Sequence, residues 1–131
     1  MDWQAAFIQR AKGAYAKTYW VNAPQGTALP YATLTDITEL RPQILGGWDL
    51  EFARVQIDVW GYNYADVQAG MLALIGKAEA PGPLILGNTS NGHTFQRADI
   101  ALGPRDIGGE REGETIVYRK SADLTFAHTA A

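Results

Sequence analysis

The chain has 131 residues, of which 47% are hydrophobic, so one folded domain over residues 1–131 can bury a core. It carries 11 basic and 14 acidic residues, a net charge of −3, without the basic stripe that is typical of nucleic-acid-binding proteins. The absence of cysteine excludes disulfides, thiolate zinc sites and cysteine nucleophiles. No secretion signal and no apolar run of ~20 residues are found, so we expect no membrane contact and folding in the cytosol.

The N-terminal part of the sequence predicts a helix and two strands. The helix covers about residues 3–17, with Asp2 as its N-cap. Its apolar stripe is narrow, so we expect it to lie on a surface; the stripe contains Trp3, Phe7, Ala11 and Ala14. A short strand is predicted from Tyr19 to Val21 and a longer one from Leu29 to Leu40, where Thr and Tyr are frequent.

The segment from Phe52 to Trp60 alternates strictly and predicts a half-buried strand. One face is apolar and consists of Ala53, Val55, Ile57 and Val59. The other face carries a cation, an amide, an anion and an indole, a mixture suited to contact with another protein. We therefore predict a subunit interface at Arg54, Gln56, Asp58 and Trp60, with salt bridges to a neighbouring subunit; a solvated polar face is the alternative.

Residues 41–51 connect these two strands and predict a hairpin tip. The pair Gly46-Gly47 permits a tight reversal of the chain. Ile44, Leu45 and Trp48 are bulky for a loop in water, so we predict that this tip docks onto a neighbouring molecule. Trp3 and Trp20, by contrast, are expected in the core, where a helix or a strand meets the sheet.

A second helix is predicted from Asn63 to about Ala78, with Asn63 as its N-cap. Gly70 is expected to let a neighbouring element approach closely. The broad apolar stripe of this helix should pack across the sheet, and it contains Val67, Met71, Leu74, Ile75 and Ala78.

Three further strands are predicted in the C-terminal part: Leu84 to Leu86, Thr94 to Leu102 and Glu114 to Phe126. Residues 87–92 are expected to be flexible, and residues 103–113, rich in glycine and charge, to form a long mobile loop. The connections have hairpin length, so the order of elements predicts an α+β fold: a mainly antiparallel sheet with two helices packed on one face.

Few residue sets have the composition of a reactive site. Ser90, His93 and Asp99 include the types of a nucleophile triad, but they lie in one loop and the strand after it, and polar loop residues are the simpler interpretation. The acidic run Glu110, Glu112 and Glu114 lacks the fixed spacing of a calcium loop and indicates a solvated charge run. We predict no catalytic residue, no cofactor and no metal site.

The central segment also resembles a known protein family. Residues 53–60, followed by residues 61–67, resemble the strand-turn-helix signature of the small tail-completion proteins of long-tailed phages, which are also called tail terminators or head–tail joining proteins. Residues 29–32 resemble the Pro-Tyr start of the family's preceding strand, and residues 114–124 its closing strand. The N-terminal helix fits in place and length. The glycine-rich stretch 103–113 is longer than the family pattern, and we expect it to become ordered on assembly.

The resemblance implies a structural virion protein without enzymatic activity. It implies a homo-oligomeric, hexameric ring at the head-proximal end of the tail tube, where the ring stops tube polymerisation and joins the tail to the head. The implied partners are the tail tube protein and the head–tail connector, in a virion assembled in the bacterial cytoplasm. Gene transfer agents use the same kind of part.

Two alternatives remain open from the sequence. One is another structural part, a head-side neck adaptor or a minor tail protein. The other is a small ligand-binding domain or enzyme, which would be favoured by a compact pocket lined by Tyr15, Tyr62 or Tyr118.

Overall fold

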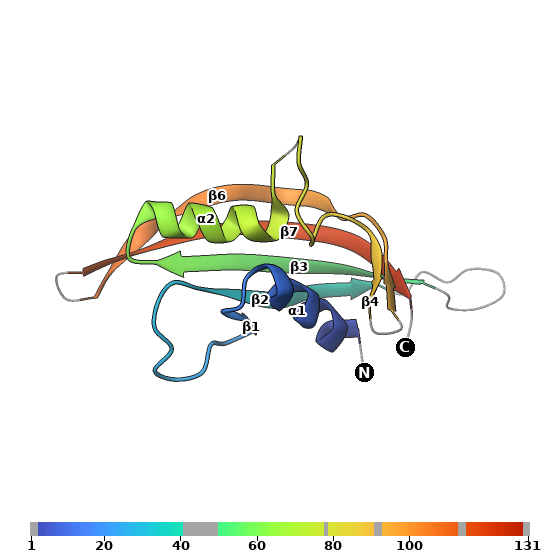
Figure 1. Cartoon of the computed structure of the whole chain (residues 1–131), viewed down its shortest axis with the longest axis horizontal. Helices are drawn as coiled ribbons and strands as arrows, with labels where there is room; N and C mark the ends of the chain where they lie inside the picture. The colour runs from blue at the N-terminus through green and yellow to red at the C-terminus, as the bar shows by residue number, and fades with distance from the viewer. Residues whose placement is uncertain (1–2, 41–49, 78, 91–92, 113–114, 130–131) are drawn as a thin grey trace.

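The protein is an α+β fold in which two helices cover one face of a mostly antiparallel sheet, as the sequence predicts (Figure 1). The structure is a computed structural model that describes residues 3–40, 50–77, 79–90, 93–112 and 115–129. Neither of the helices in these ranges has the length and apolar character needed to cross a bilayer. In chain order the elements are α1 (Trp3–Ala14), β1 (Thr18–Trp20), β2 (Tyr31–Leu40), β3 (Leu50–Gly61), α2 (Tyr64–Ile75), β4 (Asn88–Ser90), β5 (His93–Phe95), β6 (Asp99–Glu112) and β7 (Thr115–Thr129).

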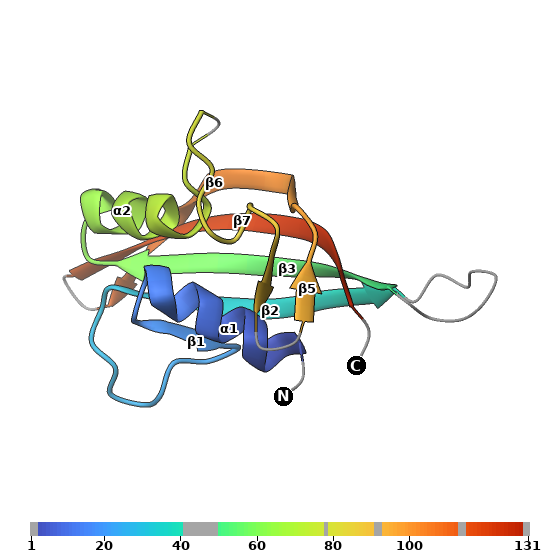
Figure 2. The ribbon, with the colours of Figure 1, turned by 45° about the vertical axis from the view of Figure 1, so that its right-hand side comes forward.

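Strands β3 and β7 form the centre of the sheet. The strand order is β1-β2-β3-β7-β5-β4, and β6 pairs with β7 as well. β1 runs parallel to β2, and the other described pairs are antiparallel. Figure 2 shows α1 and α2 on the same side of these strands, with the short β4–β5 pair beside α1. Among the described residues, no helix lies on the opposite face of the sheet.

The strand alternation of β3 was predicted correctly, and so was the stripe of α2 as far as Ile75, where the helix ends before its predicted end at about Ala78. Ala53, Val55, Ile57 and Val59 are all buried beneath the helices. The helix α2 packs onto this apolar face with the buried side chains of Val67, Met71, Leu74 and Ile75. Ala78, the last residue of the predicted stripe, lies outside the described residues. The side chain of Asn63 caps α2, because its Oδ1 accepts a hydrogen bond from the Asp66 N–H at 2.9 Å.

An aromatic cluster anchors α1 to the end of the sheet. Trp3 stacks on His128 with ring centroids 4.3 Å apart, and Phe7 stacks on Phe126 at 4.9 Å. Trp20 meets Trp3 edge to face at 6.1 Å. Trp3 therefore belongs to the core as predicted, and Trp20, which is partly buried, packs against it. The predicted helix over residues 3–17 was too long, because α1 ends at Ala14 and β1 already begins at Thr18. Ala14, which was predicted in the apolar stripe, is exposed. The predicted N-cap, residue 2, lies outside the described residues.

Gly70 lets α2 approach the sheet closely, as its position in the sequence predicts. A Cβ atom at this position would lie 2.7 Å from Val59 Cγ1 and 3.2 Å from Tyr15 Cζ. The same crowding, together with the nearby Asp66 carboxylate, raises the pKa of Tyr15, with desolvation as the larger cause.

Gly70→Ala is therefore expected to lower the free energy of unfolding by about 1–3 kcal/mol, although alanine is the better helix former. Urea unfolding followed by circular dichroism measures the change. Gly13→Ala is the matched control, since a Cβ at Gly13 would meet no atom within 4 Å. It should leave stability unchanged or raise it by up to ~1 kcal/mol. Equal effects of the two substitutions would contradict a steric role for Gly70.

The predicted strand from Leu84 to Leu86 is a turn in the structure. The backbone of this turn bonds to the end of α2 and not to a neighbouring strand. The Leu84 N–H donates to the Leu74 carbonyl oxygen at 3.1 Å, and just before the segment the Gly82 N–H donates to the Ile75 carbonyl oxygen at 2.8 Å. Leu84 and Ile85 are buried in the hydrophobic core beside the end of α2, and this packing explains their apolar character. Within the predicted flexible segment 87–92, residues 88–90 form β4.

The predicted mobile loop over residues 103–113 was wrong as far as residue 112, because this stretch belongs to β6. β6 pairs with β7 through three register shifts. Gly103 and Pro104 lie at the second shift, and Gly108 and Gly109 lie at the third. Gly103 has φ +86°, and a Cβ there would lie 2.7 Å from the Ser121 carbonyl oxygen. The predicted strand from Thr94 to Leu102 is divided into β5 and the start of β6.

Candidate assembly surface

The predicted interface residues of β3 lie on the helix-free side of the sheet. Because side chains alternate along a strand, the burial of one face of β3 under the helices places Arg54, Gln56, Asp58 and Trp60 on the other. The register brings the alternate residues of β7 beside them, since Gln56 is opposite Asp123 and Trp60 is opposite Arg119. Together these side chains form the polar face of the sheet, which consists of six residues: Arg54, Gln56, Asp58, Trp60, Arg119 and Asp123.

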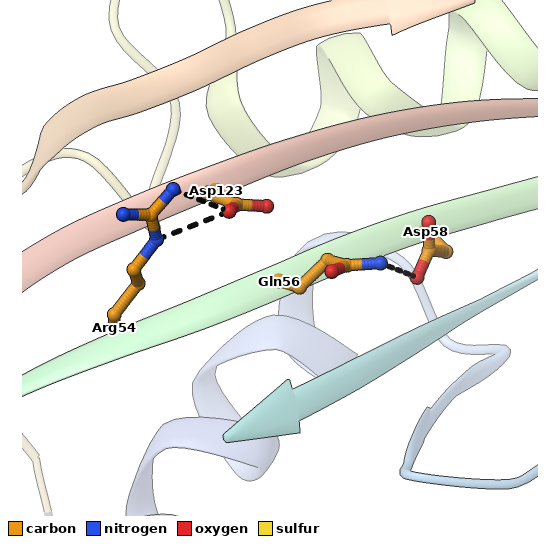
Figure 3. Close-up of polar contacts among 4 residues, drawn as sticks. All are labelled: Arg54, Gln56, Asp58 and Asp123. Atoms are coloured by element: carbon orange, nitrogen blue, oxygen red, sulfur yellow. Dashed lines mark hydrogen bonds and ion pairs between the residues drawn. The ribbon is translucent and has the colours of Figure 1, made fainter. Parts of the chain in front are cut away.

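The first ion pair of the polar face joins Arg54 to Asp123 (Figure 3). Arg54 donates from Nη2 at 2.8 Å and from Nε at 3.1 Å, both to Asp123 Oδ2. Asp123 is almost fully buried, whereas the side chain of Arg54 stays 39% exposed. Arg54 is thus held by the chain but still presents part of its guanidinium group to the outside.

The second ion pair is centred on Asp58. Arg119 donates from Nε to Asp58 Oδ1 at 2.9 Å. Gln56 donates from Nε2 to Asp58 Oδ2 at 2.8 Å (Figure 3). The Arg119 guanidinium lies over the Trp60 ring, 4.7 Å from its centroid. Trp60 in turn donates from Nε1 to Thr33 Oγ1 at 3.5 Å, a long bond. Both oxygens of the buried carboxylate are therefore satisfied within one chain.

These pairs change the expectation of salt bridges to a neighbouring subunit. The charged ends of Arg54 and Asp58 already have partners in their own chain, so a neighbour would have to share them. Thr33 and the β7 members of the network were missed by the sequence analysis. The alternation of the closing strand places Arg119 and Asp123 on one face, but sequence alone does not give the register that sets them opposite β3.

The predicted docking hairpin, with Ile44, Leu45 and Trp48, lies outside the described residues. The tyrosines of the ligand-binding alternative do not gather: Tyr62 and Tyr118 are exposed, and Tyr15 packs beside Gly70.

The residues of the hypothetical triad occupy different environments. His93 is buried beside Phe95, while Asp99 is exposed at the start of β6. Within the described ranges, no three His, Asp or Glu side chains are grouped as a metal site would require.

The fold has a counterpart among solved structures, although neither a family model nor a curated protein sequence matches the chain. The counterpart is a chain in the structure of the virion of a native gene transfer agent particle, with a TM-score of 0.62. The match covers 98% of this chain and 96% of that one, at 13% sequence identity. At this sequence identity the similarity concerns the fold alone, and the aligned region includes nearly the whole of both chains. The fold of this chain is therefore similar, from end to end, to that of a gene transfer agent virion component.

Proposed function

We propose that this protein is a structural virion component of a phage-like particle and acts as its tail terminator. In this role it forms a homo-oligomeric, hexameric ring at the head-proximal end of the tail tube. The ring stops polymerisation of the tube protein and offers its other side to the head–tail connector. The proposed role depends on shape and adhesion and involves no chemical step.

One observation carries the proposal: the end-to-end match to a chain of the gene transfer agent virion. The match covers 98% of this chain and 96% of that one, so nearly the whole chain is comparable in size and topology to a particle component. The resemblance of residues 53–67 to the tail-completion signature supports the finer assignment to the terminator.

Two surfaces are proposed to serve assembly. The polar face, with Arg54 and Trp60 partly exposed, is proposed to contact a neighbouring subunit. The hairpin containing Ile44, Leu45 and Trp48 is proposed to dock onto the tube or the connector.

The test is electron microscopy of particles from a producer strain that lacks this gene. The expected result is overlong or ragged tails beside unjoined heads, because nothing would end tube growth. A plasmid copy of the gene is the control and should restore tails of normal length joined to heads.

Other outcomes separate the alternatives. Tails of normal length that fail to attach would contradict termination and assign the protein to the head side of the joint. Intact, infectious particles would overturn the structural role and favour a ligand-binding function.

A further inference from the structure

A groove opens between the end of α2 and the start of β6, away from the polar face. It has a volume of about 550 Å³, and its apolar lining includes Ile75, Ile85, Ile100 and Pro104. Ile100 is 44% exposed, so one wall of the groove is an uncovered apolar side chain. Burying such a surface against a partner would be favourable.

Two cations stand at the groove without ion-pair partners in the described part of the chain. They are Lys77 and Arg97, both exposed, and the single carboxylate that lines the groove with them is Asp99. By contrast, Arg54, Arg119 and Lys120 all pair with carboxylates. An apolar floor with an excess of positive charge fits a segment that is both apolar and acidic.

The chain itself contains a segment of this chemistry at the β6–β7 connection. Residues 110–114 hold three glutamates, Glu110, Glu112 and Glu114, against one cation, Arg111, which leaves the segment with a net charge of −2. Directly after them in β7 stand Ile116, which is 38% exposed, and Tyr118, which is also exposed. Acidic and apolar groups therefore occur together at this end of the two strands.

This segment cannot reach the groove of its own chain. Pro104 lines the groove, whereas Glu112 ends β6, roughly eight residues or about 26 Å further along the strand. Figure 1 shows β6 ending and β7 beginning at one extreme of the long axis, beyond the first turn of α2. The groove is instead lined by Ile75 and Gly76, at the other end of this helix. The occupant must come from a second copy.

We infer that the β6–β7 end of one copy docks into the α2–β6 groove of the next, in a head-to-tail contact between subunits. Glutamate carboxylates meet Lys77 and Arg97, and Ile116 covers the apolar floor beside Ile100. A contact between two different surfaces of the same chain repeats around an axis and closes a ring when the rotation allows it. The inference rests on the proposed ring and adds a second pair of contact surfaces between its subunits, besides the polar face.

Disulfide cross-linking between full-length chains tests this contact, because the chain has no cysteine of its own. Ile100→Cys protein is mixed with Ile116→Cys protein under mild oxidation at high concentration. The expected result is a covalent dimer in the mixture and little in either variant alone. Lys12→Cys mixed with Ile116→Cys is the control, since Lys12 is exposed on α1, and it should stay monomeric. Equal dimer yield from either variant alone, or no dimer in the mixture, would overturn the inference.

Charge reversal tests the electrostatic part of the same contact. Lys77→Glu combined with Arg97→Glu is expected to lower the cross-linking yield by about five- to tenfold, as the loss of two solvent-exposed charge pairs would. Glu110→Lys with Glu112→Lys in the partner should restore it, and Lys12→Glu should change nothing. A loss without rescue would contradict the pairing. Overlong tails in the deletion strain together with absent cross-links would retain the terminator role and remove only this contact.

Discussion

Phe7→Ala is expected to lower the free energy of unfolding by about 3–5 kcal/mol, the range for truncating a fully buried aromatic side chain. Phe7 is only 1% exposed and stacks on Phe126, with Trp3 and Phe95 at its edges. The substitution would leave a cavity where α1 meets β5 and β7. Urea unfolding followed by circular dichroism gives the value.

The matched control for this prediction is Phe52→Ala on β3. Phe52 is 45% exposed on the helix-free side of the sheet, so its truncation should cost less than about 1 kcal/mol. A loss of similar size at both positions would mean that the aromatic cluster does not anchor α1.

Asp58→Ala is expected to destabilise the protein by about 2–4 kcal/mol. Asp58 is 5% exposed and satisfies both Arg119 and Gln56, so its removal leaves a partly buried guanidinium without a carboxylate. We expect the loss of stability to lie toward the lower end of this range, because the Arg119 side chain is itself 26% exposed and water can replace part of the lost interaction.

Asp106→Ala serves as the control for Asp58. Asp106 also forms an ion pair, with Lys120 at 3.5 Å, but its side chain is 57% exposed. Its loss should cost less than about 1 kcal/mol, because exposed pairs are screened by solvent. High salt should remove the small effect of Asp106→Ala but not the effect of Asp58→Ala. If high salt abolished both effects, the buried network around Asp58 would not be a source of the protein's stability.

The elements that were predicted correctly from sequence are those with a strong local pattern. The alternation of β3 and the capped apolar stripe of α2 are dictated by burial on one face, so the predicted elements agree with the structure. β6 was missed because glycine and proline usually end strands, whereas here they accompany its register shifts. The apolar run from Leu84 to Leu86 has no period, and only the tertiary structure shows that it is a turn beside the end of α2, with Leu84 and Ile85 in the core.

The β3 residues of the polar face were predictable from sequence, but their partners were not. Alternation selects the members of β3 that leave the core, but it does not name their partners. Arg54 and Asp123 are 69 positions apart in the chain, and Asp58 and Arg119 are 61 apart. Such contacts depend on the register between β3 and β7, which is a property of the whole sheet.

The irregular course of β6 has a consequence for how the protein behaves in a crowded cell. β6 pairs with β7 on one side, and no described strand pairs with its other side. A long strand in this position is a template for open-ended aggregation, yet Pro104 supplies no N–H and the three register shifts break the regular spacing of donors and acceptors. The strand that was hardest to recognise in the sequence is thereby a poor seed for fibrils, and free subunits can accumulate without uncontrolled growth of their sheets.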